Sequence, residues 1–148
     1  MSILVSDYKR PNRKLSCFSL DFWEIISSYN DYWFHLVRQT ENELIILAKC
    51  SVLIQGEKAK IEDVFVPLKY RGNGYSYLLV KQVIDILKKY DTKEDIIYMS
   101  DSVKLQFRLQ TVYLIATVDN IPANRTYEKI FGPAQKETEI NFYSIKFN

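Results

Sequence analysis

Residues Ala59 to Leu79, AKIEDVFVPLKYRGNGYSYLL, predict a strand, a glycine-containing loop and the start of a helix. The apolar run that ends at Val66 has the β-branched and aromatic bias of a buried strand, and Pro67 ends it because proline cannot donate to a ladder. Downstream, apolar residues recur mostly every three or four positions, as in a helix with one buried face. Two of the four glycines of the chain, Gly72 and Gly74, lie in the loop. Unpaired N–H groups and the positive end of the helix dipole meet at such a turn, so we expect it to bind a phosphate group.

The spacing of this loop excludes two common phosphate-binding motifs. A nucleoside-triphosphate loop needs a Lys-Ser/Thr pair after a longer glycine frame, and a dinucleotide fingerprint needs glycine at position 77, which is Tyr77 here. The hexad Arg71-Gly72-Asn73-Gly74-Tyr75-Ser76 instead resembles the pyrophosphate-binding loop of the GNAT superfamily of acetyl-CoA-dependent N-acetyltransferases. The loop of that family has the pattern Gln/Arg-x-x-Gly-x-Gly/Ala, and Ser76 departs from this pattern at the last position. For the hexad alone, an ordinary strand-loop-helix corner remains the alternative.

A second segment resembles the same family. Residues 120–132, NIPANRTYEKIFG, match its last signature segment, which has Asn, then Ala three positions on, then Tyr seven positions on, then a close of Gly and Phe. Residues 112–118 precede it and have the composition of a strand. The two segments occur in the same order as in the GNAT family, and the chain is similar to that family in both segments. The resemblance implies an α+β (mixed α/β) fold, with a central, mostly antiparallel twisted sheet flanked by helices, and acetyl-CoA as co-substrate.

The resemblance also implies roles for individual residues. In the family, the strand before the loop leaves backbone N–H groups free to bind the thioester oxygen and pantetheine, and the matching positions here are Val64, Phe65 and Val66. Tyr127 aligns with the tyrosine that protonates the departing sulfur, and Asn120 aligns with a residue that contacts the pantetheine arm. A core tyrosine and a helix N-cap are the alternatives. The carboxylates expected nearest the cleft, as candidates to hold the ammonium or relay its proton, are Glu62, Asp63 and Asp119.

The acceptor is predicted from a longer likeness. Residues 60–72 resemble the Ile-Glu-Asp-Val-x-Val…Lys-Tyr-Arg-Gly run of eukaryotic-type glucosamine-6-phosphate N-acetyltransferases, which are small dimers. The likeness implies D-glucosamine 6-phosphate as acceptor and a homodimer. Polyamine acetyltransferases share a Glu-Asp-x-Phe-Val strand, so a polyamine or protein N-acetyltransferase and a non-catalytic acetyl-CoA-binding module remain alternatives. A polyamine would need several carboxylates, whereas a sugar phosphate would need cations, for which the candidates are Arg125, Lys136 and Lys146.

Composition sets the remaining limits. A chain of 148 residues fits one domain, residues 1–148, and can bury a substantial core. A net charge of +2 is too small to indicate a nucleic-acid partner. No apolar run reaches the length of about 18 residues that spans a membrane, and the N-terminus lacks the order of a secretory signal, so we expect a cytoplasmic protein. Cys17, Cys50 and the single histidine, His35, have no metal-ligand spacing, so we expect no metal site.

Periodicity predicts the other elements. Strands are predicted over 2–8, 44–54, 58–66 and 139–147, with a hairpin turn at Gly56 between the second and third. A pair of short helices is predicted over 19–39, and the helix that begins at Gly72 is predicted to end near Tyr90. Residues 93–110 depart from the family and alternate as an inserted hairpin would. Such a hairpin either extends the sheet or serves as a lid or dimer contact.

Overall fold

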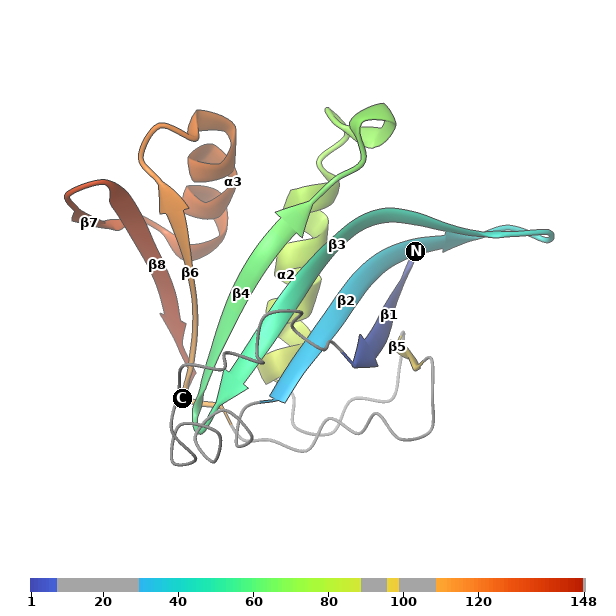
Figure 1. The fold of residues 1–148 in the computed structure, drawn as a ribbon, viewed down its shortest axis with the longest axis horizontal. Helices are drawn as coiled ribbons and strands as arrows, with labels where there is room; N and C mark the ends of the chain where they lie inside the picture. Colours follow the sequence, from blue (N-terminus) through green and yellow to red (C-terminus); the bar gives the residue numbers. More distant parts are fainter. Residues whose placement is uncertain (8–29, 89–95, 99–108, 148) are drawn as a thin grey trace, which may run out of the picture.

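The computed structural model describes residues 1–7, 30–88, 96–98 and 109–147 (Figure 1). In chain order the elements are β1 (Ser2–Asp7), β2 (Asn30–Gln39), β3 (Leu44–Gln55), β4 (Lys58–Phe65), the 3₁₀ turn η1 (Leu68–Tyr70), α2 (Tyr75–Lys88), β5 (Ile96–Tyr98), β6 (Thr111–Thr117), α3 (Ile121–Phe131), β7 (Gln135–Glu137) and β8 (Ile140–Lys146). Among these residues, no helix is long and apolar enough to cross a membrane.

The described strands form one twisted sheet in the order β5-β1-β2-β3-β4-β6-β8-β7 (Figure 1). Only β5 with β1 and β4 with β6 pair in parallel, and the other neighbours are antiparallel. α2 packs against β2, β3 and β4, whereas α3 packs against β8 and also contacts α2. The predicted α+β fold, with a mostly antiparallel sheet flanked by helices, is therefore confirmed.

Helix α2 is held on the sheet by one apolar stripe. Its fully covered side chains follow the helical period and belong to the same core as the inward side chains of the strands; they are Leu79, Val80, Val83, Ile84 and Leu87. Because this stripe fixes the helix along its length, it also fixes where the first turn of the helix lies. That first turn follows directly on the glycine loop.

The central parallel pair, β4 and β6, is joined over a short distance only. The ladder pairs Lys58–Lys60 with Thr111–Tyr113, although β4 continues to Phe65 and β6 to Thr117. Beyond the ladder the two strands separate, as Figure 1 shows. Backbone groups on these inner edges therefore lose their strand partner in the middle of the sheet, where such edges are usually paired.

One part of the sequence-based prediction is wrong. Residues 30–39 form strand β2 and not a helix, whereas 19–29 lie outside the described residues. A register shift between Leu36 and Val37 leaves both side chains fully buried, so strict alternation is broken and the apolar spacing resembles that of a helix. Five predicted strands and both helices that follow them are confirmed, with small shifts of their ends. Of the predicted insertion, β5 extends the sheet beside β1, and residues 93–95 and 99–108 lie outside the described residues.

Candidate active site

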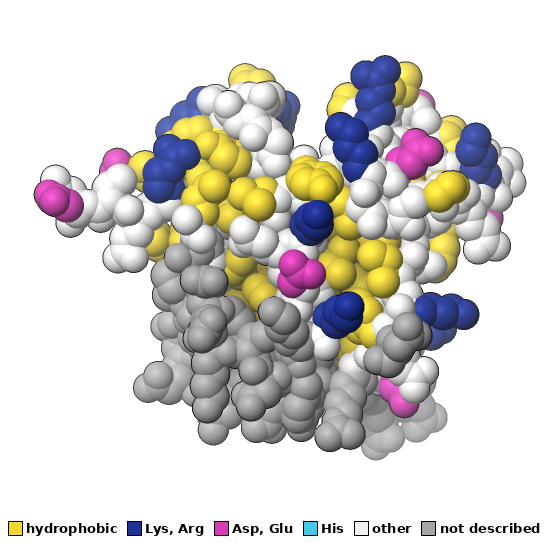
Figure 2. Space-filling model, turned by 180° about the vertical axis from the view of Figure 1, so that it is seen from behind, with side chains coloured by type: hydrophobic (Ala, Val, Ile, Leu, Met, Phe, Trp, Pro, Cys, Tyr) yellow, Lys and Arg dark blue, Asp and Glu magenta, His cyan; other side chains and the backbone are white. Residues whose placement is uncertain are grey.

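A cavity of about 470 Å³ lies where β4 and β6 separate, a volume typical of small-molecule sites. Its walls come from the end of β4, the glycine loop, the start of α2 and the first two turns of α3. Figure 2 shows it as a notch in the upper edge of the molecule, with Lys and Arg side chains on both sides. The cavity therefore lies where the pairing of β4 with β6 ends.

The glycine loop is shaped by local hydrogen bonds. Tyr70 N–H donates to the Pro67 carbonyl at 2.8 Å, Arg71 Nε donates to the Val66 carbonyl at 2.9 Å, and Asn73 Nδ2 donates to the Tyr70 carbonyl at 2.9 Å. Gly72 and Gly74 have φ of 82° and 75°, a region that glycine enters without steric cost. These contacts bring the chain round to start α2 directly after the strand.

The loop leaves a row of donors without acceptors. None of the backbone N–H groups of residues 72–77 donates to a described residue; the first helical bond is from Leu78 N–H to the Gly74 carbonyl, at 3.1 Å. The positive end of the α2 dipole lies at the same place, and the first turn contains no acidic side chain. Donors of this kind fit a phosphate or pyrophosphate group.

Upstream of the glycine loop, strand β4 contains a bulge. Between the pairs Lys49–Phe65 and Ser51–Glu62, two residues of β4, Asp63 and Val64, oppose one residue of β3. Asp63 has φ of 53°, in the left-handed region that Asp and Asn enter more readily than other side chains. The extra residue turns the end of the strand, so that Val64, Phe65 and Val66 line the cavity.

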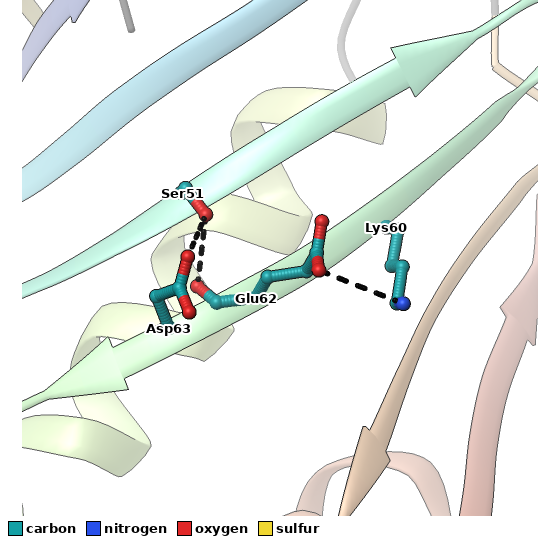
Figure 3. A network of polar contacts seen from close by, with 4 residues as sticks. All are labelled: Ser51, Lys60, Glu62 and Asp63. Carbon is teal, nitrogen blue, oxygen red and sulfur yellow. Dashed lines mark hydrogen bonds and ion pairs between the residues drawn. The ribbon is translucent and has the colours of Figure 1, made fainter. Parts of the chain in front are cut away.

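The three carboxylates predicted near the cleft do not line the cavity. Ser51 Oγ donates to Asp63 Oδ2 at 3.0 Å and to the Glu62 carbonyl at 3.3 Å, and Glu62 forms an ion pair with Lys60 at 3.6 Å (Figure 3). Asp63 therefore holds the bulge in place. Asp119 is exposed in the turn between β6 and α3.

Helix α3 supplies the remaining wall. The Asn120 side chain accepts a hydrogen bond from Ala123 N–H at 3.4 Å, so Asn120 is the N-cap, and it also lines the cavity. The position of Asn120 is therefore compatible with a helix N-cap and with a contact to the pantetheine arm. Tyr127 lies two turns along the helix and also lines the cavity.

Tyr127 is held in an apolar environment. Its side chain is 8% exposed, and its ring meets that of Tyr143 edge to face, with centroids 5.7 Å apart. No hydrogen bond joins its hydroxyl to a described residue. Burial, with smaller contributions from the neighbouring Cys50 and Tyr143, raises the pKa of Tyr127 to about 12. The phenol is therefore neutral at pH 7 and able to donate a proton.

The structure brings most of the predicted residues to one cavity. Ten of them line it: Val64, Phe65, Val66, Arg71, Gly72, Gly74, Tyr75, Ser76, Asn120 and Tyr127. Asn73 braces the loop from outside the lining. Sequence reasoning assigned no role to Tyr70, Pro122, Ala123 or Thr126, which also line it. Helical spacing gave a signal for the last two, because Ala123 lies three positions after Asn120 and Thr126 three positions after Ala123, and residues three apart are neighbours on a helix.

Comparisons with known proteins show the class of protein to which the chain belongs. A family model described as the Acetyltransferase (GNAT) family matches residues 2–103, more than half of the 148 residues, and the chain belongs to that family. It is an acetyl-CoA-dependent N-acetyltransferase, with acetyl-CoA as co-substrate. The matched range contains the glycine loop but not α3. No curated protein sequence matches the chain.

Several solved structures share the fold over nearly the whole chain. The N-acetyltransferase PseH of Campylobacter jejuni is 14% identical, with 100% of each chain covered and a TM-score of 0.56. A Bacillus subtilis acetyltransferase solved with CoA is 12% identical, with 99% of each chain covered and a TM-score of 0.53. The ribosomal-protein-S18-alanine N-acetyltransferase of Escherichia coli is 12% identical, with 99% of this chain and 94% of that chain covered and a TM-score of 0.53. These likenesses show the fold alone.

Proposed function

We propose that the protein acetylates a primary amine at the cavity between β4 and α3, and that residues 71–76 hold the pyrophosphate of acetyl-CoA. The observation that carries this proposal is the row of N–H groups of residues 72–77 without acceptors at the mouth of the cavity. Acetyl-CoA supplies the acetyl group and a thiolate leaving group. The backbone of Val64–Val66, at the end of β4, binds the thioester oxygen and the pantetheine arm.

The reaction moves one proton from nitrogen to sulfur. An acceptor amine attacks only as the neutral base, forms the new C–N bond and loses a proton, while the C–S bond breaks and the sulfur gains one. Tyr127 is neutral at pH 7 and donates its proton to the sulfur. Water returns a proton to Tyr127 from the amine side. Asp63 is engaged by Ser51, so we assign Glu62 as the group that receives the proton of the amine. Because Glu62 lies outside the cavity lining and is paired with Lys60, that proton reaches it through water.

We assign D-glucosamine 6-phosphate as the acceptor. The likeness of residues 60–72 to glucosamine-6-phosphate N-acetyltransferases supports this assignment. The three predicted cations are not gathered: Arg125 is on α3, Lys136 on β7 and Lys146 at the far end of β8. Lys49 is better placed, because its Nζ lies 5.9 Å from the ring centroid of Phe65, which lines the cavity. We therefore propose Lys49 as the contact for the phosphate of the sugar.

The competing acceptors have weaker support. A polyamine would need free carboxylates beside the cavity, but Asp63 is bonded to Ser51 and Glu62 is paired with Lys60. A peptide N-terminus is what the name of the Escherichia coli neighbour specifies for that protein. A non-catalytic module would bind acetyl-CoA and release no thiol.

Thiol release from acetyl-CoA separates these candidates. The panel contains glucosamine 6-phosphate, glucosamine, spermidine and a peptide that begins with alanine. We expect the highest kcat/KM with glucosamine 6-phosphate, and glucosamine is the matched control for the phosphate. The Lys49→Ala variant should raise KM for glucosamine 6-phosphate and leave that for glucosamine unchanged. Preference for spermidine or peptide would contradict the acceptor assignment, and no thiol release with any amine would contradict turnover.

We further propose that the protein is a homodimer. The chain contains 11 Tyr and 8 Phe, and several large apolar side chains among the described residues are exposed, including Leu44, Ile46 and Leu68. Light scattering at micromolar concentration should give about twice the monomer mass of 17.5 kDa. A mass of 17.5 kDa would contradict it.

A further inference from the structure

The side chain of Asn124, in the first turns of α3, makes hydrogen bonds in four directions. Its Nδ2 donates to the carbonyls of Thr117 and Asn120, both at 2.9 Å. Its Oδ1 accepts from Asn141 Nδ2 at 3.0 Å and from the Tyr143 hydroxyl at 2.9 Å. One carboxamide thus joins the end of β6, the N-cap of α3 and strand β8, and no other side chain type offers two donors and an acceptor at this reach.

The network is costly for the fold. Asn141 is 7% exposed, and its Oδ1 is buried without a hydrogen-bond partner among the described residues. An apolar side chain at that position would avoid an unsatisfied acceptor, so burial alone does not account for the asparagine. Ala123 and Thr126, one position before and two positions after Asn124, line the cavity, as do Asn120 and Tyr127. The network therefore determines how the cavity wall on α3 lies against the sheet.

A second contact carries this constraint to Tyr127. The Tyr143 hydroxyl is bonded to Asn124, and the Tyr143 ring packs edge to face on the Tyr127 ring at 5.7 Å. The Tyr127 hydroxyl has no hydrogen bond to a described residue that would fix it, so packing alone orients the phenol. A proton donor is effective only within a narrow range of distance and angle to the acceptor atom.

We propose that Asn124 is a positioning residue for acetyl transfer, which holds Tyr127 at the cavity through the hydroxyl and ring of Tyr143. This inference rests on the proposed role of Tyr127 as proton donor. Neither Tyr143 nor Asn124 lines the cavity, so their bond acts on the step that Tyr127 performs and not on the affinity for acetyl-CoA.

The test is a kinetic double-mutant cycle. Tyr143→Phe keeps the ring against Tyr127 and removes only the bond to Asn124. We expect kcat to fall by about 10-fold, which is less than the roughly 10²-fold loss when a proton donor is displaced by a full ångström. The KM for acetyl-CoA should stay within about 2-fold of the parental value. In a Tyr127→Phe background the same change should have no further effect on kcat, because no donor is left to position. Asn124→Ala should show the same coupling if it folds.

A core change far from the cavity serves as control. Ile3→Val, in β1, lowers stability without touching the network, and at a matched loss of Tm it should leave kcat unchanged. Parental kcat in Tyr143→Phe, or an equal fold-loss in both backgrounds, would overturn the inference while leaving Tyr127 as donor. Parental kcat in Tyr127→Phe alone would overturn the role of Tyr127, and the inference with it. The two failures are therefore distinguishable.

Discussion

The guanidinium of Arg38, near the end of β2, donates a hydrogen bond to the Tyr75 hydroxyl at 2.8 Å. Tyr75 is the first residue of α2 and lines the cavity. The contact joins the β2–β3 hairpin to the phosphate loop, although Arg38 is exposed and Tyr75 is only half-buried. An exposed hydrogen bond of this kind contributes little to overall stability, but it restrains the ring that forms part of the cavity wall.

Tyr75→Phe therefore tests whether β2 supports binding of acetyl-CoA. The change keeps the ring and removes the bond to Arg38, so we expect the Kd for acetyl-CoA to rise by less than about 10-fold, the limit that one hydrogen bond sets. Calorimetry measures it, and Lys58→Ala, an exposed cation at the far end of β4, is the control. An unchanged Kd in Tyr75→Phe would make the contact purely structural.

Gly74 provides a sharper test of the phosphate loop. No heavy atom outside its chain neighbours lies within 4 Å of a Cβ built at Gly74, but its φ of 75° strains any β-branched residue by about 1–3 kcal/mol. Gly74→Val should move the N–H groups of the loop and abolish acetyl-CoA binding in calorimetry. Arg71→Ala should only weaken binding, because main-chain donors hold most of the pyrophosphate.

Gly56 supplies the matched control for this change. It also has nothing within 4 Å of its Cβ position and a φ of 59°, but it lies in the β3–β4 turn, far along the strand from the loop. Gly56→Val should lower Tm by a similar amount and retain acetyl-CoA binding. Equal affinities in the two variants would contradict the placement of the pyrophosphate.

Asp63 distinguishes a bulge residue from a catalytic base. Asp63→Gly suits the φ of 53° and deletes the carboxylate, so we expect it to keep kcat within about 3-fold if Asp63 only holds the bulge. Glu62→Gln should instead lower kcat/KM for the amine by about 10²-fold, the scale of one acid or base group. The thiol-release assay measures both. A large loss of kcat in Asp63→Gly, at unchanged stability, would indicate that Asp63 and not Glu62 is the catalytic base.

Local pattern was enough to predict the cavity walls and not the contacts between them. The glycine loop, α2 and α3 are each encoded within about 15 consecutive residues, and so were predictable from spacing. Strand β2 was mispredicted because the bulge at Leu36 and Val37 breaks the period of two. Because Arg38 was therefore predicted to lie on a helix, its hydrogen bond to Tyr75 could not be predicted. Neither Asn124 nor its bonds to β8 have any local signal, because the partners lie 17 and 19 residues away.

The strands also explain why Glu62 and Asp63 do not line the cavity. Glu62 and Asp63 directly precede Val64, which lines the cavity, and proximity in sequence suggested proximity in space. In a strand, neighbouring side chains point to opposite faces, and the bulge turns Asp63 toward Ser51 on β3. Register and bulge position depend on pairing with β3, which the sequence of β4 alone does not contain.

Tyr127→Phe tests the proton donor directly. The ring and its contact with Tyr143 remain, so the protein should fold, while kcat falls by roughly 10²-fold because the hydroxyl acts only in the transition state. Affinity for acetyl-CoA should stay nearly unchanged. Parental turnover on the same amine would leave water or another hydroxyl to protonate the sulfur.

The raised pKa of Tyr127 gives a prediction about stability and pH. Its folded pKa is about 12 against 10.0 for the ordinary side chain, so the folded state holds this proton more tightly than the unfolded state. The corresponding stability is present below pH 10 and is lost as pH rises through about 12, a total of about 3 kcal/mol. Relative to Tyr127→Phe, the parent should therefore lose about 1.4 kcal/mol by pH 11. Urea unfolding of both proteins at pH 9 and pH 11 measures this difference. An equal change in the free energy of unfolding of the two proteins between pH 9 and pH 11 would show that the phenol is not buried as described.

The same pKa constrains the dependence of the rate on pH. Because Tyr127 remains protonated well above pH 10, it adds no falling limb to kcat below that value. The rate should rise with pH only as the acceptor ammonium loses its proton, and then level off. In Tyr127→Phe the rise should keep its midpoint while the plateau drops, since the amine is unaltered and only the donor is gone. A falling limb between pH 8 and 10 that disappears in Tyr127→Phe would assign Tyr127 a much lower pKa and a different electrostatic environment.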